Sequence, residues 1–182
     1  MKKYQIIYAD PPWDVMRGPD YNSNGPSKPL PYPTMSLMNI ENIGIGLRPY
    51  LHNDCHLYLW TINKYIKASY DVANAWGFNV SCLLTWCKPK HGIGIGGTFV
   101  QTTEHLLFCR RGTLKAKNRM DTTWFEHKRL SHSEKPQMFR DMIVSVSGDL
   151  PRIELFARQK VSGWDCWGNE VESDIELLPT LR

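Results

Sequence analysis

The chain has 182 residues, 42% of them hydrophobic, and a formal net charge of +4. This length allows one hydrophobic core and is short for two, so we expect a single domain over residues 1–182. No stretch has the apolar length of a membrane span, and the first residues lack a signal-peptide pattern; both observations predict a cytoplasmic protein with no membrane partner.

Apolar and β-branched runs bounded by Pro, Gly or Asn predict strands near residues 4–9, 55–60, 79–87, 102–109, 152–157 and, more briefly, 164–168. Helical spacing of apolar residues predicts a helix over 62–76, which Gly77 ends, and another from about Ser133 to Val146, with Pro136 in its first turn and Gly148 after its end. This alternation predicts an α/β fold with a mainly parallel sheet.

The 79–87 and 102–109 strands are joined by a glycine-rich segment without a helix, which favours an antiparallel hairpin at one edge of the sheet. Residues 14–31, 88–98 and 110–131 have loop composition. The last of these contains a basic cluster that suits a phosphate backbone, so Arg110, Arg111 and Lys115 are candidate nucleic-acid contacts. A charge run of this kind is also typical of a solvated loop.

Ligands of open α/β sheets bind at the carboxyl ends of strands, and the first predicted strand ends in Asp10-Pro11-Pro12-Trp13. A primary aromatic amine is a weak nucleophile that needs acceptors for its two hydrogens. The Asp10 carboxylate and the Pro11 carbonyl can supply them, and Trp13 can stack on a base. A strand-terminating turn with an exposed aspartate is the alternative for any bare Asp-Pro-Pro.

Several motifs in sequence order carry a family resemblance: Ala9–Trp13, Pro31–Met35, Leu57–Thr61, Glu104–Leu107, His132–Pro136, Arg152–Arg158 and Trp164–Glu170. With these motifs the chain resembles the MT-A70 family of adenine-N(6) methyltransferases. The resemblance implies methyl transfer from S-adenosylmethionine to the exocyclic amine of adenine in nucleic acid. A bare catalytic core resembles the short bacterial and phage members of the family, which favours DNA over RNA as the substrate. It also implies a Rossmann-like methyltransferase fold with permuted motifs, in which the catalytic strand comes first and the cofactor strand lies near the C-terminus.

Residue roles follow from the same resemblance. Asp10, Pro11, Pro12 and Trp13 would be catalytic, Tyr32 and Glu104 would contact the target base, and the cofactor would be held by Lys135, Glu154, Phe156, Arg158, Asn169 and Glu170. On general grounds, Lys135 and Arg158 are more often surface cations, Glu104 would face solvent, and Tyr32 could be a surface loop aromatic.

Three further expectations complete this interpretation. The catalytic tetrad Asp10-Pro11-Pro12-Trp13 is intact, which favours an active enzyme over a catalytically silent nucleic-acid-binding subunit. Relatives often work in pairs, which suggests a homodimer. The first predicted strand, which carries the catalytic motif, begins almost at Met1. Cofactor contacts that relatives make upstream of this strand would therefore be absent or replaced. His132-Ser133-Glu134 matches the His-x-Glu of zinc deaminases, but no Pro-Cys-x-x-Cys follows it, so we expect no metal site. Gly92–Gly97 resembles a dinucleotide-binding glycine motif but opens no helix, so we expect no dinucleotide site.

Overall fold

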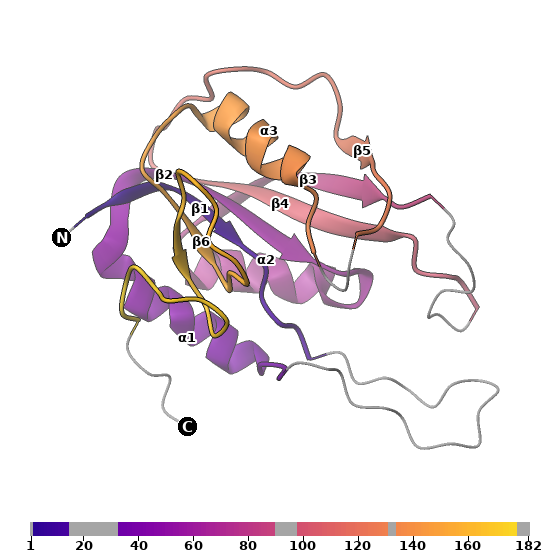
Figure 1. Ribbon diagram of the computed structural model, residues 1–182, viewed down its shortest axis with the longest axis horizontal. Helices are drawn as coiled ribbons and strands as arrows, with labels where there is room; N and C mark the ends of the chain where they lie inside the picture. The colour runs from indigo at the N-terminus through magenta and orange to yellow at the C-terminus, as the bar shows by residue number, and fades with distance from the viewer. Residues whose placement is uncertain (1, 15–32, 90–97, 131–133, 178–182) are drawn as a thin grey trace.

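The structure is a computed structural model that describes residues 2–14, 33–89, 98–130 and 134–177 (Figure 1). Tyr32, most of the predicted 14–31 loop, Gly92–Gly97 and Ser133 lie outside these ranges. The strands are β1 (Tyr4–Ala9), β2 (Leu51–Thr61), β3 (Asn79–Cys87), β4 (Thr103–Arg111), β5 (Trp124–Glu126), β6 (Arg152–Leu155) and β7 (Asp165–Trp167). The α-helices are α1 (Leu37–Leu47), α2 (Ile66–Ala75) and α3 (Gln137–Ser147), and short 3-10 turns precede β2 and α2 at Arg48–Tyr50 and Asn63–Tyr65.

All seven strands form one sheet in the order β5-β3-β4-β2-β1-β6-β7. β1 pairs in parallel with β2 and β6, β6 with β7, and β3 with β5, whereas β4 is antiparallel to both of its neighbours. The predicted α/β fold with a mainly parallel sheet is confirmed. The antiparallel pairing of β3 with β4 is also confirmed, but its predicted place at an edge is wrong, because β5 adds a further strand outside β3.

The strand directions decide where a ligand can bind. All described strands except β4 point the same way, so the carboxyl ends of β1, β2, β3, β5, β6 and β7 meet at one edge, together with the amino end of β4. We call this the carboxyl edge. Motifs that follow any described strand other than β4 are therefore delivered to one side of the molecule.

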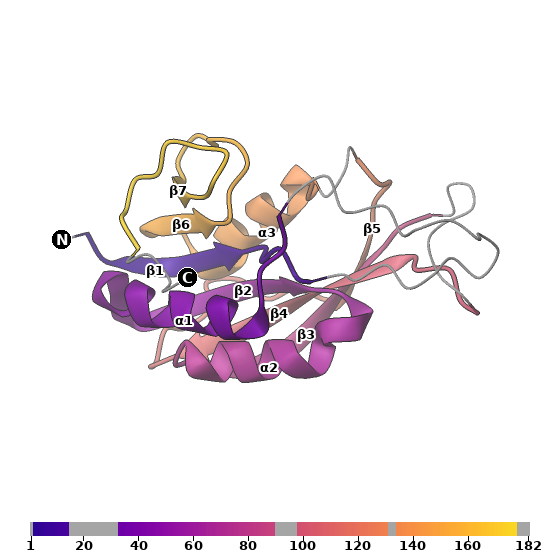
Figure 2. The ribbon, with the colours of Figure 1, turned by 90° about the horizontal axis from the view of Figure 1, so that it is seen from below.

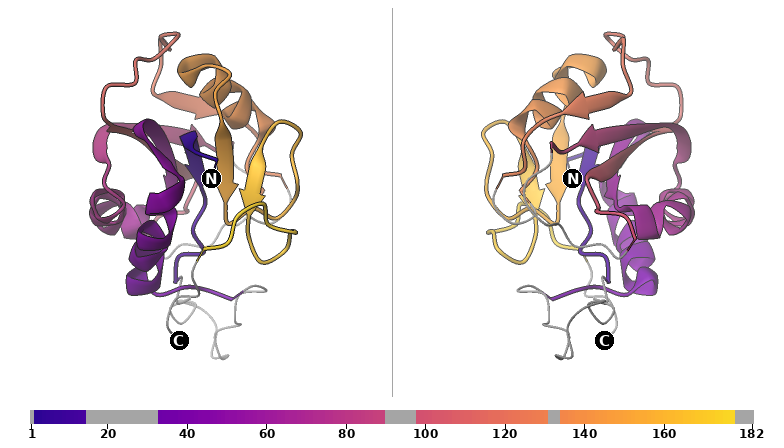
Figure 3. Two further views of the ribbon diagram at one scale, coloured as in Figure 1. Left: turned by 90° about the vertical axis from the view of Figure 1, so that its left-hand side faces the viewer. Right: turned by 90° about the vertical axis from the view of Figure 1, so that its right-hand side faces the viewer.

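Helices cover both faces of the sheet (Figure 2). α1 and α2 lie on one face and α3 on the other, and the view along the strands shows the sheet between the purple pair and the orange helix (Figure 3). Each face has its own buried cluster: the first includes Ile7, Leu57 and Trp76, and the second includes Tyr8, Trp60 and Phe139. β1 is apolar on both faces because both are buried, as is usual for a central parallel strand.

α1 was not predicted, although its signals are ordinary. The Ser36 hydroxyl accepts a hydrogen bond from the Asn39 amide at 3.3 Å, which caps the helix. Ile40, Ile43, Gly44 and Leu47 form its buried stripe. Gly44 lets the Trp76 ring lie against the helix, because a Cβ there would come within 2.2 Å of that ring.

α3 confirms the second predicted helix with a later start. Pro136 has φ −54° and ψ 137°, so it precedes the helix and does not belong to its first turn; the helix begins at Gln137. At the other end Gly148 adopts φ 98° and donates its amide to the Val144 carbonyl at 2.8 Å, as predicted for a glycine stop. Among the described residues, no helix is long and apolar enough to cross a membrane.

Candidate active site

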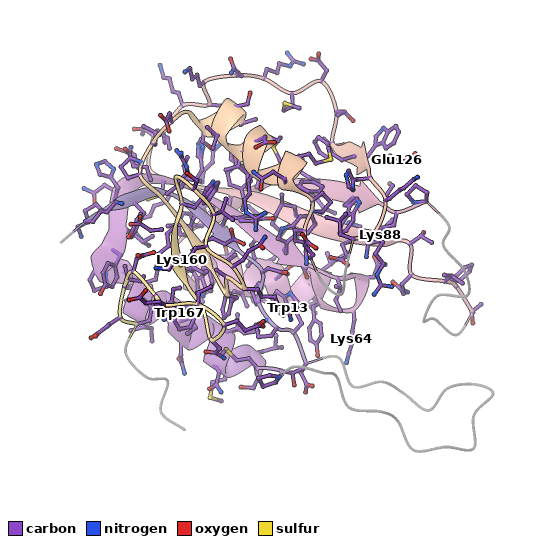
Figure 4. All side chains as sticks on the ribbon, viewed as in Figure 1. Trp13, Lys64, Lys88, Glu126, Lys160 and Trp167 are labelled. Atoms are coloured by element: carbon purple, nitrogen blue, oxygen red, sulfur yellow. The ribbon has the colours of Figure 1, made fainter. Side chains whose placement is uncertain are left out.

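A cavity of about 220 Å³ opens at the carboxyl edge of the sheet. Its walls come from segments that are distant in sequence and follow different strands: Asp10–Trp13 after β1, Trp60–Ile62 at the end of β2, Phe156–Arg158 after β6 and Trp167–Glu170 at the end of β7. Glu104, Lys135, Pro33 and Met35 complete the lining. Figure 4 labels Trp13, Lys88 and Trp167, which come from the ends of β1, β3 and β7 around this edge. Most of the residues predicted from the motifs are thus brought together.

A row of alternating charges crosses the substrate side of the cavity. The Lys135 ammonium lies 2.6 Å from an Asp10 carboxylate oxygen and 3.3 Å from a Glu104 carboxylate oxygen, and Lys88 pairs with the other oxygen of Glu104. The Lys135 side chain is 7% exposed and its ammonium lies 5.1 Å from the centre of the Trp60 ring. A cation this deeply buried needs such partners, so Lys135 fixes the positions of both carboxylates.

Burial and charge act on these groups in opposite directions. Burial raises the pKa of Asp10, and the attraction of Lys135 only partly offsets it because Glu104 repels a second negative charge. Burial also disfavours ionisation of Glu104, but Lys135 and Lys88 outweigh it and lower the pKa of that carboxyl. Burial works against the charge on Lys135, yet the two carboxylates raise its pKa, so it stays protonated.

This arrangement predicts a pH dependence. Asp10 can stabilise positive charge on an amine and take up its proton only when ionised, so activity falls as the pH falls through its raised pKa, and the acid limb of kcat/KM lies above the range of an ordinary aspartate. Lys135→Gln removes the attraction and leaves the burial, so the limb should move to higher pH. Profiles normalised to their maxima measure the shift, with Lys160→Gln, an exposed lysine, as control. An unmoved limb in Lys135→Gln would contradict the assignment.

The Pro-Pro-Trp segment is held by its own hydrogen bonds. The Trp13 amide donates to the Pro11 carbonyl at 2.8 Å, and the Met35 amide donates to the Pro12 carbonyl at 2.8 Å. A carbonyl has two lone pairs, so the Pro11 carbonyl can still accept a second hydrogen bond. The predicted open stacking face on Trp13 is not what the structure shows. Trp13 is 5% exposed, stacks on Tyr65 and donates its indole N–H to the Trp60 carbonyl at 3.0 Å, which makes it an anchor for the turn.

The opposite wall is a close crossing of two chain segments. Phe156 has φ 61°, a left-handed conformation that costs a non-glycine residue about 1–2 kcal/mol, and it turns the chain out of β6. Its ring meets Trp167 edge to face at 5.5 Å. The Ala157 amide donates to the Trp167 carbonyl at 3.0 Å, and a Cβ on Gly168 would lie 2.2 Å from the Ala157 carbonyl oxygen. Only glycine fits this crossing.

With this geometry established, the comparison with known proteins is direct: residues 4–170 match the sequence profile of MT-A70. The chain belongs to the MT-A70 family. Type II methyltransferase M.MunI of Mycoplasma sp is 30% identical over 98% of this chain and 82% of its own length. The N(6)-adenosine-methyltransferase catalytic subunit METTL3 of Homo sapiens is 26% identical over 97% of this chain and 29% of its own length. A putative MT-A70-like N(6)-adenosine-methyltransferase of Medicago truncatula is 24% identical over 97% of this chain and 28% of its own length.

The chain therefore spans less than a third of these two plant and animal relatives and most of the Mycoplasma one. The predicted family is confirmed. So are its activity, an adenine N(6)-methyltransferase, and its methyl donor, S-adenosylmethionine.

The wall formed by Phe156–Arg158 and Trp167–Glu170 fits the MT-A70 cofactor chemically. S-adenosylmethionine carries an amino-acid zwitterion, a ribose diol and a purine. Around the crossing, the cavity offers two aromatic rings, the Asn169 amide and the Glu170 carboxylate. Arg158 lies 3.4 Å from Glu170, with 38% of its side chain exposed. These groups would hold the ribose and the purine, while Lys135 stands nearer to Asp10 and Glu104 than to this wall.

One MT-A70 motif residue that was predicted to hold the cofactor, Glu154, does not line the cavity. Glu154 is 8% exposed on β6 and accepts two hydrogen bonds of 2.7 Å from the Arg140 guanidinium, which joins α3 to the sheet. This ion pair explains why its carboxylate faces α3 and not a cofactor. Tyr32 lies outside the described residues.

The basic cluster is also separated from the MT-A70 site. Arg110 and Arg111 end β4, while Glu104 lies near its beginning. Six residues of strand span roughly 20 Å. Lys115 follows in the loop beyond them. Arg110, Arg111 and Lys115 therefore lie at the opposite edge of the sheet from Asp10, because β4 runs antiparallel to its neighbours.

Two residues of the site were missed. Lys88 directly follows β3, so the strand-end rule could have singled it out. Trp60 lies in one of the family motifs, but the sequence predicted no role for it. Its ring lies beside the Lys135 ammonium, and its backbone carbonyl accepts the hydrogen bond from the Trp13 indole. Within the described residues, no group of three or more His, Cys, Asp or Glu side chains could hold a metal ion.

Proposed function

We propose that this chain is an active DNA methyltransferase that methylates adenine at N6, and not a silent partner subunit. The observation that carries the proposal is the pairing of Asp10 with Lys135 at 2.6 Å, in the same cavity as the Phe156–Arg158 and Trp167–Glu170 walls. A silent subunit has no need to bury a lysine against the tetrad aspartate. DNA is supported by the Mycoplasma relative, a type II methyltransferase that this chain matches over most of its length.

In this proposal the wall that contains Asp10 and Pro11 orients the substrate amine, and the wall that contains Phe156 and Gly168 holds the cofactor. S-adenosylmethionine, when bound, supplies a methyl group that is attached to a sulfonium and is therefore electrophilic. Asp10, ionised beside Lys135, accepts one amine hydrogen and the Pro11 carbonyl accepts the other, which turns the nitrogen lone pair toward the methyl carbon. Asp10 also stabilises the positive charge that grows on the nitrogen and is the first acceptor for the proton it releases.

The strand order supports the permuted Rossmann-like arrangement. β1 is first in the chain and delivers Asp10, while β6 and β7, close to the C-terminus, deliver Phe156 and Gly168. β1 and β6 are neighbours in the sheet, with Ala9 opposite Leu155, so the two halves of the site face each other across one pair of strands. The catalytic half thus precedes the cofactor half in sequence although they are adjacent in space.

Nucleoside analysis tests the proposal. The purified chain is incubated with S-adenosylmethionine and matched DNA and RNA strands, in single- and double-stranded form, and the digested nucleosides are measured by mass spectrometry. We expect N(6)-methyldeoxyadenosine from DNA at a rate at least tenfold above N(6)-methyladenosine from RNA. A preference for RNA would overturn the choice of DNA. Product from neither, with intact cofactor binding, would favour the silent subunit.

The cofactor wall gives a second test. Arg158→Ala and Asn169→Ala should each weaken binding of S-adenosylhomocysteine about tenfold, a loss of about 1.4 kcal/mol, and leave the thermal midpoint within a few degrees. Lys160→Ala, at another exposed position between β6 and β7, is the matched control. Calorimetry without nucleic acid measures the effect. Wild-type affinity in both variants would show that these residues are not part of the cofactor wall.

The nucleic-acid surface gives a third test. DNA whose target base enters the cavity must pass across the carboxyl edge, where Lys64, Lys128 and Arg129 are exposed. Neutralising these three should reduce the slope of log affinity against log salt by about 2–3. The corresponding triple change at Arg110, Arg111 and Lys115, roughly 20 Å away, should reduce it less. The reverse order would assign DNA binding to the basic cluster at the end of β4.

Oligomeric state, location and the role of Tyr32 complete the proposal. We infer a cytoplasmic enzyme that works as a homodimer, which sedimentation of the full chain at micromolar concentrations would detect. Tyr32, at the end of the 14–31 segment, stays a candidate wall for the target base.

A further inference from the structure

A second cavity, of about 470 Å³, lies on the α3 side of the sheet. It shares no lining residue with the catalytic cavity. Its lining comes from β2, β3, β4, β5, α3 and the segment between β4 and β5: Tyr58, Cys82, Leu84, Phe108, Arg110, Ala116, Lys117, Asn118, Arg119, Met120, Thr122, Thr123, Phe125, Met142 and Val146. Figure 1 shows that segment passing along α3 before it enters β5. The volume lies in the range of small-molecule sites.

The floor of this second cavity is apolar and aromatic. Phe125 and Met142 are 7% and 8% exposed, and Phe108, Leu84 and Val146 are half-buried beside them. The Phe108 ring packs against Tyr58 at 5.2 Å. A flat apolar group placed here would be covered by these side chains and would contact rings, which favours an aromatic body.

The rim carries positive charge. The Arg110 guanidinium lies 5.1 Å from the centre of the Phe108 ring, at the border between floor and solvent. Lys117 and Arg119 are exposed on the facing segment, and no acidic side chain belongs to the lining. An apolar floor bordered by cations of one sign complements a ligand with an anionic group at one end.

The facing segment is anchored, so the second cavity is built by fixed backbone. The Lys117 amide donates to the Val146 carbonyl at 2.7 Å, and the Asn118 side-chain amide donates to the Ser145 carbonyl at 2.9 Å. Before them, the Leu114 carbonyl lies 3.0 Å from a ring nitrogen of the buried His56. These contacts fix the segment that forms this wall against β2 and the end of α3.

We infer that the second cavity is a binding site for a small aromatic anion: a ring body that packs on Phe108 and Phe125, with a carboxylate, sulfonate or phosphate that meets Arg110 at the rim. The site is independent of the methyl-transfer cavity and of the proposed choice of DNA as substrate. Cys82 lies in its lining, and Cys87, on the same strand, lies outside it.

The two cysteines make the test specific to this location. The full chain is saturated with S-adenosylhomocysteine, incubated with the aromatic sulfonate 8-anilino-1-naphthalenesulfonate, and treated with iodoacetamide; peptide mass spectrometry then gives the alkylation rate of each cysteine. We expect the sulfonate to slow alkylation of Cys82 at least fivefold and to leave Cys87 within twofold, with one probe bound per chain. The neutral analogue N-phenyl-1-naphthylamine should bind at least fivefold more weakly.

Neighbouring arginines provide the matched variants. Arg110→Gln should raise the Kd of the sulfonate about tenfold, whereas Arg111→Gln, which removes the same charge from the next residue outside the lining, should change it less than twofold. Equal effects of the two variants would reduce the site to general electrostatic attraction and overturn the inference. So would unprotected Cys82, protection of Cys87 to the same extent, or equal binding of the neutral analogue. Unchanged thermal midpoints confirm that both variants are folded.

Discussion

Replacing Asp10 by alanine is expected to lower kcat for methyl transfer by at least about a hundredfold, because the change deletes the group that orients and stabilises the attacking amine. Asp10 directly follows β1 and lies in the cavity with the proposed cofactor wall, and the Glu104 carboxylate shares its partner Lys135. Glu104 is held by both Lys135 and Lys88 and cannot replace it without breaking two ion pairs. Single-turnover transfer to DNA, with saturating S-adenosylmethionine, measures the effect.

The Asp10 variant also removes a partner of the buried Lys135, so structural and chemical losses must be separated. Thermal midpoint and S-adenosylhomocysteine affinity are measured on Asp10→Ala and on Asp10→Asn, which keeps the shape and loses the charge. Asp149→Ala is the matched control, since Asp149 is exposed and pairs with Arg152 away from the cavity. Turnover of Asp10→Ala within fivefold of wild type would rule out the orienting role. A cofactor affinity that falls as far as turnover does would point to a structural role.

Strands with one continuous apolar run were predictable from sequence. Residues 4–9 and 79–87 match β1 and β3 in their bounds, because each is a short run rich in apolar and β-branched residues that ends next to proline or glycine signals. β5 was not predictable: three residues within a basic, aperiodic segment become a strand only because β3 offers an unpaired edge. α1 was missed although Ser36 caps it, since Gly44 and Gly46 lower its helix propensity. Gly44 leaves room for the Trp76 ring, and the spacing of residues in the sequence does not reveal this contact.

The site shows the same division. The strand-end rule singled out Asp10, and motif order singled out Glu104, Lys135 and the segments Phe156–Arg158 and Trp167–Glu170; the structure brings all of them to one cavity. Sequence could not show that Lys135 pairs with Asp10, because 125 residues separate them and the pairing depends on how α3 crosses the sheet. It also could not show that Glu154 turns away to Arg140, since alternate residues of a strand differ in face and the register was unknown.

Gly168→Ala is expected to have the second large effect, on cofactor binding. A Cβ at this position would lie 2.2 Å from the carbonyl oxygen, 2.8 Å from the nitrogen and 3.0 Å from the carbonyl carbon of Ala157. These are backbone atoms beside a residue already held in a left-handed turn, so the clash cannot be relieved by rotating a side chain. The ends of β6 and β7 must move apart, which breaks the 3.0 Å bond between the Ala157 amide and the Trp167 carbonyl.

The two segments that separate in Gly168→Ala are the ones that form the proposed cofactor wall, so we expect S-adenosylhomocysteine affinity to fall at least tenfold, with an overpacking cost of about 1–3 kcal/mol in the free energy of unfolding. Gly163→Ala separates these effects. Gly163 has φ 78° and a Cβ there would meet only the Arg152 side chain, so alanine strains the backbone without touching the wall. It should lower stability by a similar amount and leave cofactor affinity within twofold. If calorimetry shows Gly168→Ala binding the cofactor as tightly as Gly163→Ala does, the crossing stabilises the sheet but does not shape the cofactor site.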